Sequence, residues 1–178
     1  MPAVLAQVPG AKLLIAGCDH PNRPGYLRGL AEKTGPQKWL QWLGYLDEDR
    51  LAEVFQSSHV AVMPYLSSGG PSGVAHLACR FGLPIVSAAI DDLVQMADEE
   101  GFAMDTYDPC DAADLAGKLV ALARDPQRQR HMGEQNYRAA LNATMPKVVA
   151  SYLAEFARLS GESLELSEIG AEGEVEAA

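Results

Sequence analysis

The chain has 178 residues, enough for one domain with its own hydrophobic core, and its apolar and charged fractions of 48% and 21% are ordinary for a globular protein. The net charge of −10 argues against a general nucleic-acid-binding protein, and the longest apolar runs are too short to span a bilayer. No signal peptide is evident, and three cysteines without metal-like spacing indicate a reducing compartment. We therefore expect a cytoplasmic protein with no metal site and no transmembrane segment.

Apolar runs alternate with amphipathic segments along nearly the whole chain. The predicted strands are residues 12–16, 39–43, 60–63, 83–86 and 101–104. The predicted helices are residues 26–33, 47–56, 73–81, 91–97, 111–124, 126–141 and 145–159. This alternation predicts an α/β fold, a Rossmann-like parallel sheet with helices on both faces.

The last 18 residues differ in composition from the rest of the chain. Residues 161–178 contain six glutamates and no lysine or arginine. This composition predicts an acidic, disordered tail that follows a single domain over residues 1–160. A short helix that docks on a partner is the alternative for this segment.

The most informative segment runs from Val60 to Ser87, where the pattern predicts a strand, a glycine-rich loop, a helix and a second strand. The loop lies at the carboxyl end of its strand, where open α/β sheets bind ligands. Gly69, Gly70, Ser72 and Gly73 would let a diphosphate approach the backbone, and the helix N-terminus would present free N–H groups to it. The alternative is a plain turn, with Ser72 as the N-cap of the helix.

Four stretches in this order carry a resemblance to a known family. They are KLLIAG, WLGYLDEDRLAEVFQSSHVAVMPY, ACRFGLPIVSA and DPCDAADLAGKLVALARDPQRQRHMG. Over residues 12–159 the chain resembles the carboxyl-terminal, nucleotide-sugar-binding half of a GT-B glycosyltransferase of the retaining family 4 type (glycosyl transferases group 1). The resemblance implies a hexosyltransferase of carbohydrate biosynthesis that uses a UDP- or GDP-linked sugar as substrate, without a further cofactor.

The resemblance also implies where the donor lies. The base would rest near Gly44, Tyr45 and Leu46, at the end of the strand over residues 39–43, although Tyr45 could equally be a surface aromatic. His76, one helical turn from Ser72, could reach a ribose or a phosphate, or it could be structural. No catalytic residue is assigned. The candidate donor-binding set is Gly44, Tyr45, Leu46, Gly69, Gly70, Ser72, Gly73 and His76.

The chain departs from the family pattern at two places. The two glutamates that the family carries fall here on Gly69 and Leu77, whose side chains cannot accept a hydrogen bond. Residues 1–8 match only the helix that follows the family's first strand in this half, so that strand and the basic pair after it are missing. Because the first strand of a doubly wound sheet is central, we expect a gap beside the strand over residues 12–16.

Three functional hypotheses follow. In the first, the domain binds the donor of a glycosyltransferase, and an amino-terminal half or a second chain supplies the acceptor site, with the whole cytoplasmic or peripheral to the inner face of the membrane. In the second, the module keeps the fold and binds nucleotides or partners without catalysis. In the third, the domain belongs to another α/β class. A dinucleotide-binding domain would carry a GxGxxG fingerprint after its first strand, and this chain has GCDHPNRPG at that place instead.

Overall fold

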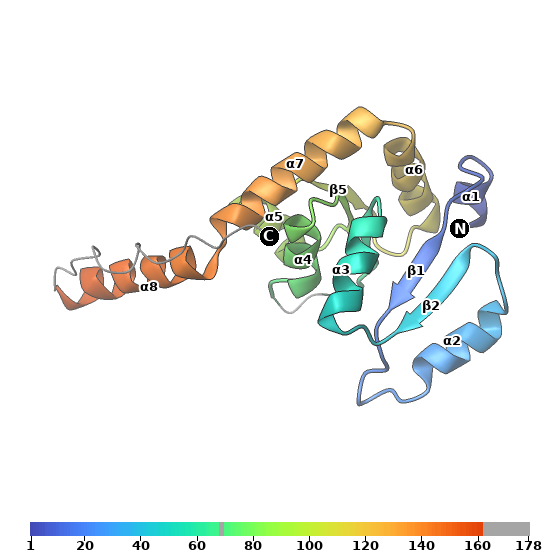
Figure 1. Ribbon diagram of the computed structural model, residues 1–178, viewed down its shortest axis with the longest axis horizontal. Helices are drawn as coiled ribbons and strands as arrows, with labels where there is room; N and C mark the ends of the chain where they lie inside the picture. The colour runs from blue at the N-terminus through green and yellow to red at the C-terminus, as the bar shows by residue number, and fades with distance from the viewer. Residues whose placement is uncertain (68–69, 162–178) are drawn as a thin grey trace.

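The computed structural model of the protein describes residues 1–67 and 70–161 (Figure 1). Its strands are β1 (Leu13–Ala16), β2 (Leu40–Gly44), β3 (Ala61–Met63), β4 (Ile85–Ala88) and β5 (Met104–Tyr107). Its helices are α1 (Pro2–Leu5), α2 (Tyr26–Thr34), α3 (Glu48–Ser57), α4 (Gly73–Arg80), α5 (Asp91–Glu100), α6 (Ala112–Ala123), α7 (Pro126–Asn142) and α8 (Met145–Ser160). Strands and helices alternate as far as α6, which confirms the predicted α/β class.

The strands form two separate parallel sheets. One contains β1 and β2, and the other contains β3, β4 and β5 in that order. The predicted gap beside the strand over residues 12–16 is present, because no strand of the described residues pairs with the second edge of β1. The parallel sheet is therefore interrupted where its first strand was expected to be missing.

Helices cover both faces of the three-stranded sheet. All four residues of β4 are buried. Ile85 packs on one face with apolar residues of α4 and α5, whereas Val86 packs on the other face with Leu122 of α6. Alternate residues of a strand point to opposite faces, so this central strand is apolar throughout.

Three of the helices begin at an aspartate whose carboxylate accepts a backbone N–H from the first turn. Asp47 accepts from Arg50 at 2.9 Å, and Asp111 and Asp125 cap α6 and α7 in the same way. Capping of this kind satisfies amides that have no partner within the helix. The predicted and observed starts of these three helices agree to within one residue.

Helix α7 lies across α4 and fixes the amino-terminal ends of two strands through Asn136. This side chain is fully buried. Its amide nitrogen donates to the carbonyl oxygens of Leu83 at 2.8 Å and of Ala103 at 3.1 Å. Its oxygen accepts the Ala103 N–H at 2.6 Å. One side chain therefore satisfies three backbone groups just before β4 and β5.

The last two strands begin later than the sequence predicts, at Ile85 rather than residue 83 and at Met104 rather than residue 101. The Leu83 N–H still closes α4 by donating to Ala78 O at 2.9 Å. The following helix, α5, continues to Glu100, and the Phe102 N–H closes it by donating to Ala97 O at 2.8 Å. The residues that were predicted to begin these two strands therefore end the preceding helices instead.

Helix α8 projects from the end of α7 away from the sheets (Figure 1) and buries none of its residues. Its exposed apolar side chains follow one stripe at helical spacing, namely Met145, Val149, Tyr152, Phe156 and Leu159. Within the described ranges, no helix combines the length and the apolar character needed to cross a membrane. The predicted acidic tail lies outside the described residues from 162 onward.

Candidate functional site

The loop after β3 leads into α4 through Ser72, which is the N-cap that the sequence predicts. The Ser72 hydroxyl oxygen accepts the Ala75 N–H at 3.3 Å, and the hydroxyl lies 3.7 Å from the sulfur of Met63. The Ser72 N–H points to the sulfur of Met96 at 3.4 Å. Ser72 is buried, so its side chain is committed to the fold at this turn.

The first two amides of α4 are open to solvent. Gly73 and Val74 are both exposed, and within the described residues neither N–H has an acceptor. A Cβ at Gly73 would meet no atom within 4 Å, and Gly70 has a φ of 132°, which favours glycine. Gly69, the remaining glycine of the predicted cradle, lies outside the described residues. The positive end of α4 therefore offers two N–H donors to an anion.

The His76 side chain is held by two hydrogen-bond contacts and does not extend into the loop as a free group. Its Nδ1 lies 2.8 Å from the Ser72 carbonyl oxygen, and its Nε2 lies 2.8 Å from Oε2 of Glu100. Its ring also packs edge-on against Phe102. A carbonyl and an ionised carboxylate can only accept, so these contacts are satisfied when both ring nitrogens donate. The arrangement ties α4 to the end of α5, and a contact of His76 with the donor stays a prediction.

Cys79, on the inner face of α4, is excluded as a nucleophile. Burial, with a smaller contribution from the charge of Glu100, raises the pKa of the Cys79 thiol from 9.0 to about 12. The thiolate is the reactive form of cysteine, and it is not populated here near neutral pH. The sequence prediction of a buried, apolar role for Cys79 is confirmed.

Carboxylates of α5 lie beside the loop. A groove of about 210 Å³ runs between Gly70 and Pro71 on one side and α5 on the other, where it is lined by Asp92, Gln95, Met96, Glu99 and Glu100. Carboxylates repel phosphates and accept hydrogen bonds from hydroxyl groups. This side of the loop suits the hydroxyl groups of a ribose or a hexose, and the amides of α4 suit the diphosphate.

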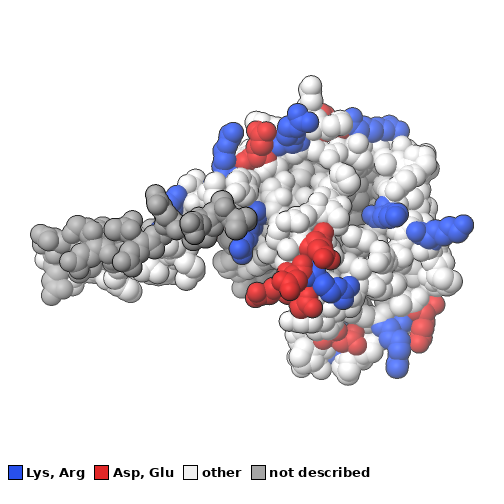
Figure 2. Space-filling view, in the orientation of Figure 1, with Lys and Arg blue, Asp and Glu red and all other residues white. Residues whose placement is uncertain are grey.

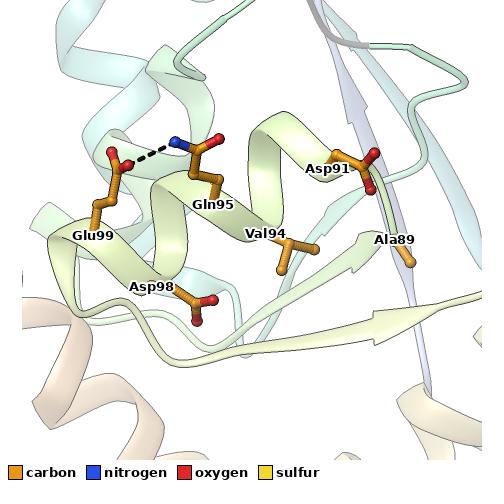
Figure 3. A pocket seen from close by; sticks show the side chains of 6 residues that line it. All are labelled: Ala89, Asp91, Val94, Gln95, Asp98 and Glu99. Atoms are coloured by element: carbon orange, nitrogen blue, oxygen red, sulfur yellow. Dashed lines mark hydrogen bonds between the residues drawn. The ribbon is translucent and has the colours of Figure 1, made fainter.

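A second groove, of about 370 Å³, runs along the outer surface of α5 (Figure 3) and is lined by Ala89, Asp91, Val94, Gln95, Asp98 and Glu99. Gln95 donates to Glu99 at 2.7 Å within it. Its acidic lining does not suit a diphosphate. Among the described residues, no group of histidine, cysteine and carboxylate side chains could hold a metal ion.

The predicted base-binding residues lie at the carboxyl end of β2. Gly44 is the last residue of β2 and has a φ of 68°, and its carbonyl oxygen accepts the Gly17 N–H at 2.8 Å. Tyr45 is 76% exposed, whereas Leu46 is buried and offers only its backbone. Both parts of the candidate set thus follow a parallel strand, and their contact with a nucleotide stays a prediction.

Sequence reasoning missed Glu100 as a member of this region. Glu100 is the last residue of α5 and reaches His76, which lies 24 residues earlier. No local pattern links the two positions. Leu77, where the family resemblance would put a glutamate, is a partly buried residue within α4.

Figure 2 shows that one face of the molecule carries basic and acidic side chains in mixture. Charged side chains of the described residues also pair along helices, as in Arg138 with Glu134 and Arg28 with Glu32. The face shown has no broad basic area of the kind that binds a nucleic-acid backbone.

Comparison with known families and structures gives a consistent result. The profile of glycosyl transferases group 1 matches residues 1–125. No curated protein matches the chain. Sucrose-phosphate synthase from Thermosynechococcus elongatus is similar in structure with a TM-score of 0.70 and 22% identity, and HepE from Anabaena in complex with UDP has a TM-score of 0.68 and 15% identity. A GtfA/B complex is similar with a TM-score of 0.70 and 21% identity.

These similarities cover almost all of this chain and a minority of each related chain. The three comparisons cover 89%, 90% and 89% of this chain. They cover 41%, 45% and 31% of the chains that they match. The present chain therefore spans less than half the length of these structural relatives.

Proposed function

Since the chain belongs to the glycosyl transferases group 1 family, we propose that it binds the nucleotide-sugar donor of a glycosyltransferase and takes part in sugar transfer to an acceptor hydroxyl. The observation that carries this proposal is the open amino-terminal end of α4, directly after the loop that follows β3. A diphosphate is the ligand that such a helix end favours. The donor is a substrate, and the proposal includes no further cofactor.

The geometry suggests a division of roles. The amides of Gly73 and Val74 hold the diphosphate, and hydrogen bonds from fixed N–H groups stabilise the charge that develops on it as the sugar leaves. The carboxylates of Asp92 and Glu100 accept hydrogen bonds from hydroxyl groups of the ribose or the sugar. The backbone from residue 44 to residue 46 reads the base. The nucleotide is uridine or guanosine diphosphate, and uridine has the support of HepE structures with UDP and UDP-glucose.

The acceptor site and the remaining catalytic groups belong, in this proposal, to an amino-terminal half or to a second polypeptide. The chain spans less than half of its structural relatives, and one of them is a GtfA/B complex. Residues 1–160 act as one domain and residues 161–178 as an acidic tail. A cytoplasmic location, free or at the inner face of the membrane, is supported by the three free cysteines.

The role of α4 can be tested by removing one amide without disturbing the helix. Proline is tolerated at the first position of a helix, and Ser72, which precedes it, already has extended φ and ψ of −99° and 112°. Gly73→Pro therefore deletes one N–H and keeps α4. We expect it to weaken UDP binding by about 10- to 100-fold, as for one hydrogen bond to a charged group.

Gly73→Ala is the matched control, because it keeps the N–H and adds a Cβ in open space. NMR titration of the full chain with UDP and with GDP gives both the affinity and the residues contacted. Equal affinity of the two variants would remove α4 from the phosphate site. Absence of any binding by the unaltered chain at millimolar nucleotide would contradict the proposed function itself.

A nucleotide-binding module without transfer activity is the second candidate. It is favoured by Leu77, an apolar residue at a position where the family resemblance expects a glutamate. The two candidates separate in an assay of sugar release from UDP-glucose and GDP-mannose by the chain combined with a matching amino-terminal half. Transfer to an acceptor supports the enzyme, and tight binding without turnover supports the module.

A further inference from the structure

The Ser72 carbonyl oxygen accepts two hydrogen bonds from one residue. The backbone N–H of His76 donates to it at 3.2 Å, as in the first turn of any α-helix, and Nδ1 of the His76 ring lies 2.8 Å from it. A carbonyl oxygen has two lone pairs, so it can accept both bonds. The side chain of His76 therefore adds a second bond to a peptide group that an ordinary helix holds by one.

The same peptide group carries the Gly73 N–H, which is one of the two open amides of α4. The peptide between Ser72 and Gly73 is trans. Because a peptide is planar, its C=O and N–H point in opposite directions and rotate together. A bond that holds the carbonyl toward the body of α4 thus holds the N–H toward the open end of the helix. A donor at the C=O also polarises the peptide and strengthens its N–H as a donor.

The contact with the peptide depends on the charge of the His76 ring. Oε2 of Glu100 lies 2.8 Å from Nε2, so acceptors lie at both ring nitrogens and both contacts require the imidazolium. When the ring loses one proton, the carboxylate is the stronger acceptor and Nε2 keeps its hydrogen. Nδ1 then presents a lone pair to the Ser72 oxygen, and the hydrogen bond between them is lost.

Glu100 is the ion-pair partner of His76, and 37% of the His76 side chain and 31% of the Glu100 side chain are exposed. A pair with this exposure contributes little to stability, so its variants should fold. Phe102, which packs edge-on against the ring, carries no charge, and Glu134 and Arg138 of α7 pair with each other at 3.8 Å. The further titratable groups on the adjoining turns of α4 and α5 are the thiol of Cys79, which is neutral near pH 7 because burial raises its pKa to about 12, and the side chains of Arg80, Asp98 and Glu99.

We propose that His76, held as an imidazolium by Glu100, positions the Gly73 N–H for the diphosphate of the donor. This inference rests on the proposed function, because the diphosphate is the ligand proposed there for α4. His76 is a positioning residue, since it acts through the peptide that it holds and makes no bond to the donor. Its charge adds to the positive end of the helix dipole, and an anion at the open amides compensates for both. Glu100 lines the groove beside the loop, so the pair joins the amide side of the site to its carboxylate side.

The contact with the peptide is tested on the full chain without nucleotide. Carbon-detected NMR follows the Ser72 carbonyl carbon and the His76 ring between about pH 5 and pH 8, the range in which histidines change charge. We expect the carbonyl resonance to shift in step with the ring and to stay in place in His76→Gln. His131→Gln removes an exposed histidine of α7 and should keep the shift. A carbonyl resonance of the unaltered chain that stays in place while the ring titrates would overturn the proposal, without any variant having to fold.

Glu100→Gln tests the part of the carboxylate. The glutamine amide can donate to Nε2, so a neutral His76 ring can keep its hydrogen on Nδ1 and its bond to the Ser72 carbonyl. We expect the carbonyl resonance of this variant to move much less with pH than that of the unaltered chain. Asp98→Asn is the matched control, because it removes one negative charge from an exposed position of α5 and should keep the full shift. A full shift in Glu100→Gln would overturn the role of Glu100.

Titration with UDP measures the effect on binding. We expect His76→Gln to weaken UDP binding by about 3- to 10-fold near pH 6, and by less near pH 8, where the unaltered chain has lost the imidazolium. The terminal phosphate of UDP also changes charge in this range, so the ratio of the two affinities is compared at each pH. A ratio that is the same at both pH values would overturn the proposal.

The double variant Gly73→Pro with His76→Gln separates positioning from direct contact with the donor. Gly73→Pro removes the N–H through which His76 acts, so the double variant should lose less affinity for UDP than the product of the two single losses. A loss equal to that product would mean that His76 acts on the ligand by another route, and it would overturn the proposal. Absence of UDP binding by the unaltered chain would contradict the proposed function, whereas the carbonyl titration gives its result in either case.

Discussion

Substitution of Gly133 by alanine is expected to destabilise the protein although alanine is the better helix former. Gly133 lies in the middle of α7, where this helix crosses the turn after α4. A Cβ at Gly133 would lie 2.3 Å from the carbonyl oxygen of Gly82 and 3.3 Å from its carbonyl carbon. Both obstacles are backbone atoms, so no side-chain rotation relieves the contact.

The magnitude follows from two opposing contributions. Alanine in place of a helical glycine contributes about 1 kcal/mol to the free energy of unfolding. Forcing a methyl group into a closed contact costs about 1–3 kcal/mol or more, because α7 must move away from α4. That movement also lengthens the hydrogen bonds of Asn136, one turn further along α7. The net expectation is a loss of up to about 2 kcal/mol.

Gly117→Ala provides the matched control. Gly117 lies inside α6, is exposed, and would place its Cβ in open space. We expect this variant to gain about 0.5–1 kcal/mol from helix propensity alone. Urea unfolding followed by circular dichroism measures both. The reasoning is refuted if Gly133→Ala is stabilised as much as Gly117→Ala.

Other predictions concern buried polar and thiol groups. Asn136→Ala leaves three backbone groups without their partner and should lower the free energy of unfolding by about 3–5 kcal/mol in a urea titration. The control Gln135→Ala loses one exposed hydrogen bond to Gly101 O and should lower it by under about 1 kcal/mol in the same titration. Iodoacetamide should modify the two exposed cysteines of the native chain and spare Cys79 until urea unfolds the protein; rapid native modification of all three would contradict its burial. Because the pKa of Cys79 rises from 9.0 to about 12 on folding, its contribution to stability is complete below pH 9 and is lost as the pH rises toward 12. The urea midpoint of the unaltered chain should therefore fall over this range more steeply than that of Cys79→Ala.

The parts of the fold that the sequence predicts are those with a local physical cause. Aspartate caps, apolar periodicity and turn glycines act within a few residues, so α3, α6 and α7 begin within one residue of their expected positions. The extension of β5 past residue 104 was not predictable in this way. Asp105 is a polar residue within a sheet, and its partner is Arg128 on α7, 23 residues later.

In the candidate site, too, the features with a local cause could be predicted and the long-range contacts could not. The capping role of Ser72 could be read from its place before an apolar helix, and the structure confirms it. The contact of His76 with Glu100 joins two helices through a residue pair 24 positions apart. Neither residue carries a local signature of the other, so the fixed orientation of His76 becomes evident only when α4 and α5 are placed together.

The position of Asn136 has a consequence for the order in which the chain folds. Its partners Leu83 and Ala103 lie 53 and 33 residues earlier in the chain. Closing such long loops costs conformational entropy before the contacts stabilise the fold, so we expect these contacts to form late. We therefore expect the carbonyl groups before β4 and β5 to stay bonded to water until α7 docks. On a ribosome, the two strands would emerge well before Asn136. The exit of α7 would then set the moment at which water is excluded from this part of the core.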